Sequence, residues 1–145
     1  MDYFASLRQN VVNSLLLMVG DVPLIMNGPN DLLLMKRSGN GCWGPPGRAV
    51  ELGEIVETTA RCEDREVTGV EFREMSLIDV GSGPEVYYVH PNGDEVHNIT
   101  IVYLAHHTGG EVFLNGEHSA WDWYAQIDIP GIYQPAHPAR YCAVY

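Results

Sequence analysis

The sequence predicts an α/β domain built on a mixed β-sheet, and three observations support this fold class. Apolar runs of strand length occur both before and after one helix-forming segment, residues 55–68. Turn-forming residues join neighbouring strand candidates into hairpins, most clearly Pro91-Asn-Gly-Asp94 with its Asn-Gly pair. The 145 residues contain no internal repeat or linker-like stretch, and this length is typical of one hydrophobic core. Strands on both sides of one helix favour a mixed sheet over a doubly wound parallel one, in a single domain covering residues 1–145.

The first third of the chain predicts a short helix followed by a hairpin. Asp2 is suited to cap a helix over residues 2–8, within an N-terminal helical segment of residues 1–11. Gly20-Asp21 is expected to break the apolar run that follows this helix. Dense turn chemistry at residues 27–31 then joins two strand candidates into a hairpin. The strands expected in this part are residues 15–19, 22–26 and 32–36.

The second half of the chain predicts a succession of strands. Gly69 is expected to end the central helix, and Gly109-Gly110 to end a long strand candidate. Residues 121–124 alternate large apolar and polar side chains, which predicts a strand with its aromatic rings directed inward. Residues 127–138 are predicted to be irregular, with a short final helix. The other strands expected here are residues 75–80, 86–89, 98–105 and 111–114.

The composition limits the partners and the setting of the protein. A formal net charge of -11 argues against binding to nucleic-acid backbones or anionic membranes. A phosphate-bearing ligand would need metal ions or local arginines to reverse the field at its site. The apolar run at residues 12–19 is too short to span a bilayer, and no signal segment precedes it. Cys42, Cys62 and Cys142 are too few and too scattered for a disulfide framework or a zinc site, so a reduced, cytoplasmic setting is predicted.

A loop rich in glycine and proline, residues 44–54, leads into a helix that carries more acid than its burial requires. Glu63 and Glu66 lie three residues apart in that helix, so their carboxylates share one face. Two carboxylates held side by side repel each other unless an arginine, a lysine or a divalent metal lies between them. A solvated helix face is the simpler alternative. The spacing therefore indicates either a cation site or a polar surface.

The loop and the helix together resemble the Nudix box, the signature motif of the Nudix hydrolases, at residues 48–70. That motif reads Gly, five residues, Glu, seven residues, Arg-Glu-aliphatic, one residue, Glu-Glu, one residue, Gly-aliphatic. The chain agrees with the motif at Glu54, Glu63, Glu66, Gly69 and Val70. It differs at Arg48, Cys62, Asp64 and Val67, which replace the first glycine, the arginine, the first aliphatic residue and the last glutamate. The flanking strand candidates extend the resemblance to residues 12–135.

The resemblance implies a Nudix-like α/β/α sandwich and a hydrolase that cleaves the pyrophosphate of a nucleoside diphosphate derivative, such as a nucleotide sugar or ADP-ribose. It implies Mg²⁺ or Mn²⁺ as cofactor and metal-activated water as nucleophile, because clustered carboxylates supply the hard oxygen ligands that these ions prefer. It implies a small nucleotide substrate and neither a nucleic-acid nor a membrane partner. The sequence leaves open whether the protein forms a homodimer, for which Tyr3–Leu7 is the candidate contact.

The glutamates take their implied roles from their positions in the box. Glu63 and Glu66 would be catalytic residues and metal ligands, and either could also help to deprotonate water. Glu54 would be a third catalytic residue that supports the loop. Because the box arginine is absent here, Glu54 would take Arg61 or Arg65 as its ion-pair partner.

Further site residues are implied outside the helix. Arg37, Gly47 and Arg48 would bind the substrate. Arg48 would either strain the loop or place its guanidinium group near the helix carboxylates as an internal substitute for the metal. Glu117 would be a further metal ligand or base recruited from a late loop, with Glu111 as its rival.

Two other interpretations remain. Val67 removes one carboxylate from the implied metal site, so the chain could be a catalytically impaired Nudix-fold protein that serves as a ligand-binding or interaction module. It could also be an unrelated acidic α/β domain whose helix imitates the box.

Overall fold

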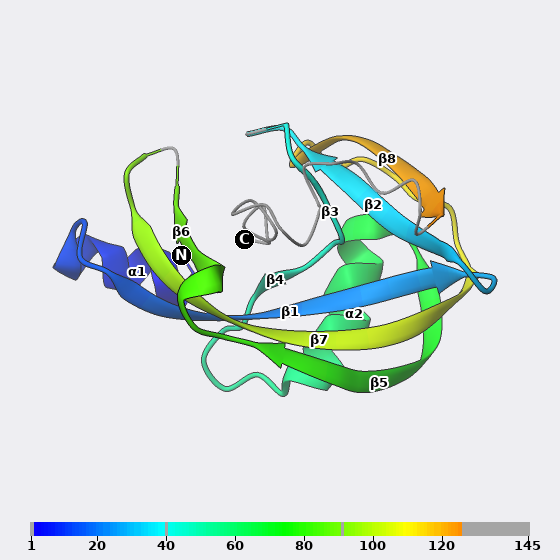
Figure 1. The fold of residues 1–145 in the computed structure, drawn as a ribbon, viewed down its shortest axis with the longest axis horizontal. Coiled ribbons are helices and arrows are strands. Elements are labelled where there is room, and N and C mark those ends of the chain that lie inside the picture. The colour runs from blue at the N-terminus through cyan, green and yellow to red at the C-terminus, as the bar shows by residue number, and fades with distance from the viewer. Residues whose placement is uncertain (1, 40, 91, 126–145) are drawn as a thin grey trace.

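The structure is a computed structural model that describes residues 2–39, 41–90 and 92–125 (Figure 1). The irregular segment and final helix expected at residues 127–138 lie outside the described residues. The side chains of Glu63 and Val67 are not among those described, although both residues belong to a described helix. The helices are α1 (Tyr3–Val11), α2 (Val56–Thr68) and the short 3-10 helix η1 (Pro84–Val86). The strands are β1 (Leu16–Asn27), β2 (Asp31–Arg37), β3 (Trp43–Gly44), β4 (Arg48–Ala49), β5 (Glu71–Gly81), β6 (Tyr87–Val89), β7 (Glu95–Gly109) and β8 (His118–Ala125).

The described strands form one mixed sheet with the order β3-β2-β1-β7-β5. The remaining strands extend it, because β4 pairs with β1, β6 with β7 and β8 with β2. β1 and β7 run parallel along the centre, from Leu16 opposite Val96 to Met26 opposite His106. β2 and β5 join this pair in antiparallel orientation. The mixed sheet predicted from the sequence is therefore confirmed.

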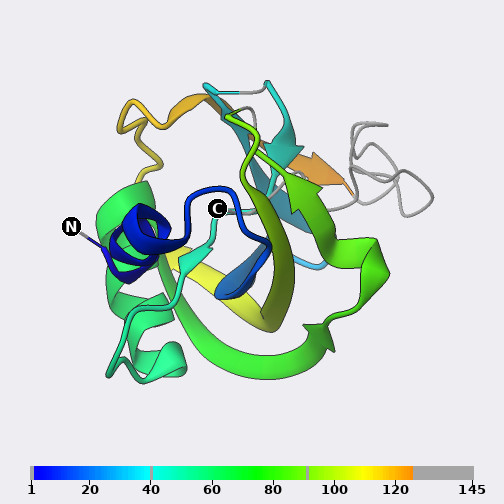
Figure 2. The same cartoon turned by 90° about the vertical axis from the view of Figure 1, so that its left-hand side faces the viewer.

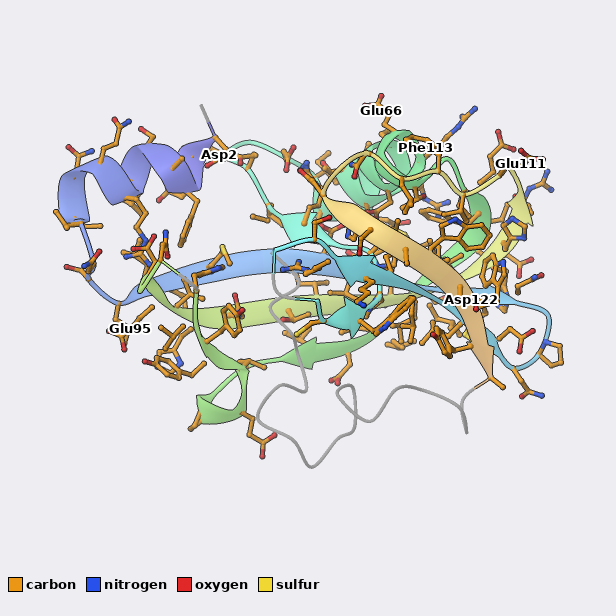
Figure 3. The ribbon with its side chains drawn as sticks, turned by 90° about the horizontal axis from the view of Figure 1, so that it is seen from above. Asp2, Glu66, Glu95, Glu111, Phe113 and Asp122 are labelled. Atoms are coloured by element: carbon orange, nitrogen blue, oxygen red, sulfur yellow. The ribbon has the colours of Figure 1, made fainter. Side chains whose placement is uncertain are left out.

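Both α-helices lie on the same side of the β1–β7 pair (Figures 2 and 3). α2 packs onto the sheet through Ala60, which is fully buried against Met75, Tyr103 and Ala105. Asp64 is also buried, at 3% exposed, on the helix face where the Nudix box has an aliphatic residue. The sheet and its covering helix therefore fix the backbone that carries the box.

β1 is one continuous strand, so the expected break at Gly20-Asp21 is wrong. Gly20 and Asp21 pair with Ala49 and Arg48 of β4 on one edge and with β7 on the other. These tertiary ladder partners override the local preference of the two residues for a turn. Pro23 lies between the stretches of β1 that pair with β4 and with β2. Its missing N–H therefore removes no bond to either of these neighbours.

The hairpin predicted before β7 is present in the structure, but the strand predicted after β7 is not. At the predicted hairpin, the His90 N–H donates to the Asp94 carbonyl at 2.8 Å, and β6 and β7 pair in antiparallel orientation. The strand expected at residues 111–114 is wrong, because these residues form a loop. In that loop the Phe113 N–H donates to the Thr68 carbonyl at 3.0 Å. The loop therefore lies against the C-terminal end of α2, and Figure 3 labels its residue Phe113 there.

Gly69 ends α2, as the sequence predicts. Its φ of 77° is a left-handed conformation, which favours glycine at a helix C-terminus. A side chain at this position would also place its Cβ 2.4 Å from the Glu111 carbonyl oxygen and 2.6 Å from the Phe113 ring. The backbone conformation and the crossing loop thus both require glycine here.

The aromatic residues of β8 follow the prediction only in part. Trp123 packs against the buried cluster of Ile25, Leu33 and Val70. Trp121 is 37% exposed. The predicted strand is confirmed; Trp121 lies on the same face as Trp123, and both rings line one small cavity, but only Trp123 reaches the core.

α1 begins at its predicted cap and is tied to two other parts of the chain. The Asp2 carboxylate accepts a backbone N–H of the first turn at 2.6 Å. The Tyr3 N–H donates to Oε2 of Glu51 at 2.8 Å. Near the other end, the Arg8 guanidinium group donates to the Glu95 carbonyl at 2.7 Å. α1 thus bridges the box loop and the start of β7.

Two findings bear on the predicted setting. In the part of the chain that the structure describes, no helix has the length and apolar character needed to cross a bilayer. Cys42 is disulfide-bonded, which differs from the reduced state expected of the cysteines, whereas Cys62 is an exposed free thiol.

Candidate active site

A cavity of about 760 Å³ opens beside the box loop. Its lining residues come from α1, from β1, from the loop around β4, from the end of β2, from the β6–β7 turn and from the start of β8. The cavity brings together four of the residues that the sequence singled out, namely Arg37, Gly47, Arg48 and Glu117. The three substrate-binding candidates therefore lie in one place, together with one of the metal-ligand candidates.

Three arginines line this cavity, together with four carboxylates, namely Asp2, Glu51, Asp94 and Glu117. Three of the eight lysines and arginines line it, namely Arg8, Arg37 and Arg48. His90 and His118 line it too. Burial is the main cause that lowers the pKa of both histidines below 6.5, so both are mainly neutral at pH 7. The charge of Arg37 also lowers both pKa values, whereas Asp94 opposes the shift at His90 and Glu117 opposes it at His118. A local group of arginines is the arrangement that a phosphate-bearing ligand would need in so acidic a protein.

Glu54 has a different partner from the two that the sequence suggested. Its carboxylate is ion-paired and hydrogen-bonded to Arg48, and it also accepts the Glu51 N–H at 2.7 Å. Arg61 and Arg65 pair elsewhere, with Glu57 at 3.3 Å and with Glu71 at 3.0 Å respectively. The proposal that either arginine supports Glu54 is therefore wrong. Arg48 supplies the guanidinium group that the box normally takes from the position of Cys62.

Arg48 fits its position without backbone strain. It lies in β4 and pairs with Asp21 of β1. It is not among the described non-glycine residues with positive φ, which are Val12 and Glu74. The expected strain at this former glycine position is therefore wrong, and the side chain stabilises the loop through Glu54.

Replacing Arg48 with alanine is expected to lower the free energy of unfolding by about 1–2 kcal/mol, because it leaves a half-buried carboxylate without its charged donor. Arg61→Ala is the matched control, since the Arg61–Glu57 pair is more exposed and is expected to contribute about 0.5 kcal/mol or less. Urea denaturation of both variants measures the difference. Equal effects of the two substitutions would contradict the assigned role of Arg48.

The same pair predicts how stability depends on pH. The hydrogen bond from Arg48 is the main cause that holds the pKa of Glu54 below 4.5, with burial acting in the opposite direction. The unfolded state therefore binds more protons than the folded state in this range. The contribution of the pair is fully present above pH 4.5 and is lost as the pH falls through the lowered pKa. In urea denaturation from about pH 6 down to about pH 3, Glu54→Gln should show a shallower loss of stability than the wild type.

The Glu66 carboxylate takes no part in the Arg48–Glu54 ion pair. Glu63 and Glu66 both belong to α2, at positions that share one helix face. The Glu66 side chain is exposed and points away from the sheet (Figure 3). It makes no hydrogen bond or ion pair with the described residues, and it does not line the cavity. No three His, Cys, Asp or Glu side chains of the described part converge on a metal position. The structure thus does not bring Glu66 together with Glu117.

Glu117 and its rival Glu111 lie at different sites. Glu117 is exposed at the edge of the large cavity, just before β8, and its carbonyl accepts the Ser38 N–H at 3.0 Å. Glu111 lines a smaller cavity of about 330 Å³ together with Trp121 and Trp123. Of the two glutamates, only Glu117 shares a cavity with the box loop.

Several lining residues were not singled out from the sequence as site residues. Arg8, Asn92 and Asp94 reach the cavity from α1 and from the β6–β7 turn. The helix cap and the Asn-Gly turn were visible signals for the two elements. No local pattern indicates that these elements meet, because their contact joins residues far apart in the chain.

Comparisons with known proteins agree with this fold and this loop. The model of the NUDIX domain matches residues 19–142. An ADP-ribose pyrophosphatase from Methanocaldococcus jannaschii is 38% identical over 109 residues, which are 73% of this chain and 61% of that protein. The chain thus spans less than two thirds of the length of this relative.

Solved structures give the same result. A MutT NUDIX hydrolase from Burkholderia pseudomallei is 32% identical to this chain, with a TM-score of 0.66. The match covers 88% of this chain and 95% of that protein's chain. A MutT protein from Methanosarcina mazei is 27% identical, with a TM-score of 0.56. The match covers 75% of this chain and 77% of that protein's chain. The mixed sheet, the box loop leading into α2 and the match over residues 19–142 establish that this chain belongs to the Nudix hydrolase family and has its α/β/α sandwich fold.

Proposed function

We propose that the protein hydrolyses the pyrophosphate bond of a nucleoside diphosphate derivative, such as ADP-ribose or a nucleotide sugar. The observation that carries this proposal is the gathering of Arg37, Arg48 and Glu117 in one cavity beside the box loop. Arginine side chains suit the oxygen atoms of a pyrophosphate, because a guanidinium group can donate two parallel hydrogen bonds. The ADP-ribose pyrophosphatase among the relatives supports the substrate class.

The donor set of α2 fits a divalent cation such as Mg²⁺ or Mn²⁺. Nudix hydrolases generally use divalent metal ions. Glu63 and Glu66 would hold the ion here, because carboxylate oxygens are its preferred ligands and the two residues share one helix face. Glu66 suits this role because no described residue engages its carboxylate. When bound, the metal ion would neutralise phosphate charge and make a water molecule more acidic.

The other residues of the site would position the substrate. Arg37 and Arg48 would bind phosphate oxygens from two sides of the cavity, with Gly47 allowing close approach of the loop backbone. Glu54 would fix the guanidinium group of Arg48 through their ion pair. Glu117 would lie close enough to the substrate to accept a proton or to add an oxygen ligand. A cytoplasmic location and a homodimer remain predictions.

The test is turnover of a defined set of nucleotides. The purified protein would be incubated with ADP-ribose, a nucleotide sugar and a nucleoside triphosphate in the presence of Mg²⁺ or Mn²⁺. Chromatographic separation of the nucleoside monophosphate product measures cleavage of each compound. Hydrolysis of the first two compounds is the expected result, and absence of turnover with every compound and both metals would refute the proposal.

One observation favours a second function, a nucleotide-binding module without catalysis. Val67 stands where the Nudix box has a carboxylate, so the donor set on α2 contains one acid fewer than in the motif. In that case the cavity would still bind nucleotide. Calorimetry would then detect nucleotide binding in a protein that shows no turnover.

A further inference from the structure

One wall of the large cavity is built from parts of the chain outside the Nudix box. Phe4 and Arg8 come from α1, and Asn92 and Asp94 come from the β6–β7 turn. We call these four residues the helix–turn wall. Both elements stand at the same end of the molecule, on the left in Figure 1. The wall faces a cavity whose remaining sides include the box loop and the end of β2.

Asp94 is the anchored carboxylate of this wall. Its side chain is 20% exposed, and its Oδ2 accepts the Asn92 Nδ2–H at 3.0 Å. The same oxygen lies 3.5 Å from Nε of Arg8. The Asp94 N–H donates to Oδ1 of Asn92 at 3.0 Å, so the two side chains fix each other. No hydrogen bond from the described residues occupies Oδ1 of Asp94.

Arg8 holds this arrangement through hydrogen bonds from its two terminal nitrogens, whereas its buried Nε makes no hydrogen bond with the described residues. Its terminal nitrogens donate to the Glu95 carbonyl at 2.7 Å, to the Val12 carbonyl at 3.1 Å and to the Ser14 carbonyl. Its side chain is only 11% exposed. Arg8 therefore acts as a positioning residue that joins α1 to the turn and orients Asp94.

Two other acidic residues of the cavity already bind backbone groups at the start of α1. Asp2 accepts the Ala5 N–H at 2.6 Å, and Glu51 accepts the Tyr3 N–H at 2.8 Å. Glu117 is exposed at the opposite side, beside β8. Asp94 is thus the carboxylate that the helix–turn wall presents to a ligand.

The chemistry of the wall differs from that of the arginine side. An ionised carboxylate accepts hydrogen bonds and donates none. It therefore suits hydroxyl donors and repels phosphate. A carboxylate is the group that dinucleotide-binding folds use for ribose hydroxyls. The Phe4 ring and the buried Met18 add apolar surface that can contact the carbon face of a ring. The cavity therefore joins a phosphate-binding side to a side suited to a neutral, hydroxylated ring.

We infer that Asp94 is a specificity-determining residue that hydrogen-bonds the hydroxyl groups of a ring linked to the far side of the pyrophosphate. It selects a nucleoside diphosphate joined to a hydroxylated ring over a nucleoside triphosphate, whose terminal phosphate would meet the carboxylate. This inference rests on the proposed function, since it assumes that the pyrophosphate lies at Arg37 and Arg48. It goes beyond that proposal by naming the residue that reads the attached group.

The test compares affinities for ADP-ribose and ATP, measured by calorimetry without metal, in the wild type and in Asp94→Asn. The wild type should bind ADP-ribose more tightly than ATP. Asp94→Asn should lose about 10-fold or more in affinity for ADP-ribose, on the scale of a hydrogen bond to a charged group, while its affinity for ATP stays equal or rises. Asp79→Asn is the control, because Asp79 is an exposed carboxylate of β5 that accepts one N–H, from the Val80 backbone, and does not line the cavity. The control should keep the wild-type ratio.

The outcomes separate this inference from the proposed function. An unchanged ratio in a folded Asp94→Asn variant overturns the inference, even if the protein turns over ADP-ribose. A shifted ratio in a protein without turnover supports the inference and refutes the hydrolase. If the variant fails to fold, the wild type alone decides, because tighter binding of ATP than of ADP-ribose, or binding of neither, overturns the inference.

Discussion

Replacing Glu66 with glutamine is expected to lower kcat about 100-fold or more, the scale of loss when one electrostatic catalytic group is removed. Glu66 lies on the exposed face of α2, and its carboxylate makes no bond with the described residues. The substitution therefore removes a charge that stabilises no described contact of the fold. It also keeps the shape of the side chain, so the melting temperature should change little.

Glu57→Gln supplies the control for this experiment. Glu57 is an exposed acid on the same helix, and its only described ion pair is with Arg61 one turn away. Its loss should leave kcat within a factor of about two, since surface pairs contribute little. If Glu66→Gln and Glu57→Gln had the same small effect, Glu66 would have no place in the catalytic site.

Replacing Val67 with glutamate is expected to tighten the binding of Mn²⁺ by about 10–100-fold, because even the groups that support metal ligands contribute on this scale. Residue 67 lies next to Glu66 in α2 and is the position at which the Nudix box has its last carboxylate. A restored acid would add an oxygen ligand and a negative charge at one end of the donor set. Calorimetric titration of the wild type and the variant with Mn²⁺ measures the change.

Cys62→Glu adds the same charge to the same helix at a different position, whose side chain is exposed, so it controls for a general electrostatic effect. This control should raise the affinity for Mn²⁺ far less than Val67→Glu does. Equal affinities in the two variants would mean that residue 67 does not border the metal. Arg48 should be left unchanged in these variants, because its removal would deprive Glu54 of its ion pair.

The fold could be predicted where local patterns decide the structure. The Asn-Gly turn, the Asp2 cap and Gly69 each act within a few residues, and each was found where it was expected. β1 could not be predicted as one strand, because Gly20-Asp21 is held in the sheet by β4 and β7, which come later in the chain. Pairing with distant strands thus overrides the turn preference of Gly20-Asp21.

The same distinction applies to the site. The register of the box identified Glu54 and Arg48 as site residues, but not that they pair, because a motif gives spacing and not the direction of side chains. The contact between Arg8 and the start of β7 joins residues 87 positions apart. No sequence pattern of either segment contains that information. The helix–turn wall was therefore accessible only from the folded structure.

The parallel pairing of β1 and β7 also has a consequence for the order in which the protein folds. Leu16 meets Val96, about 80 residues later, so the central pair of strands closes a long loop before it gains its ladder of hydrogen bonds. Contacts of such long range slow the folding of a domain. On the ribosome, β1 would have to wait for most of the chain to emerge before its main partner exists. The hairpin of β1 and β2 and the helix α2 can form earlier, which makes them the natural starting points of folding.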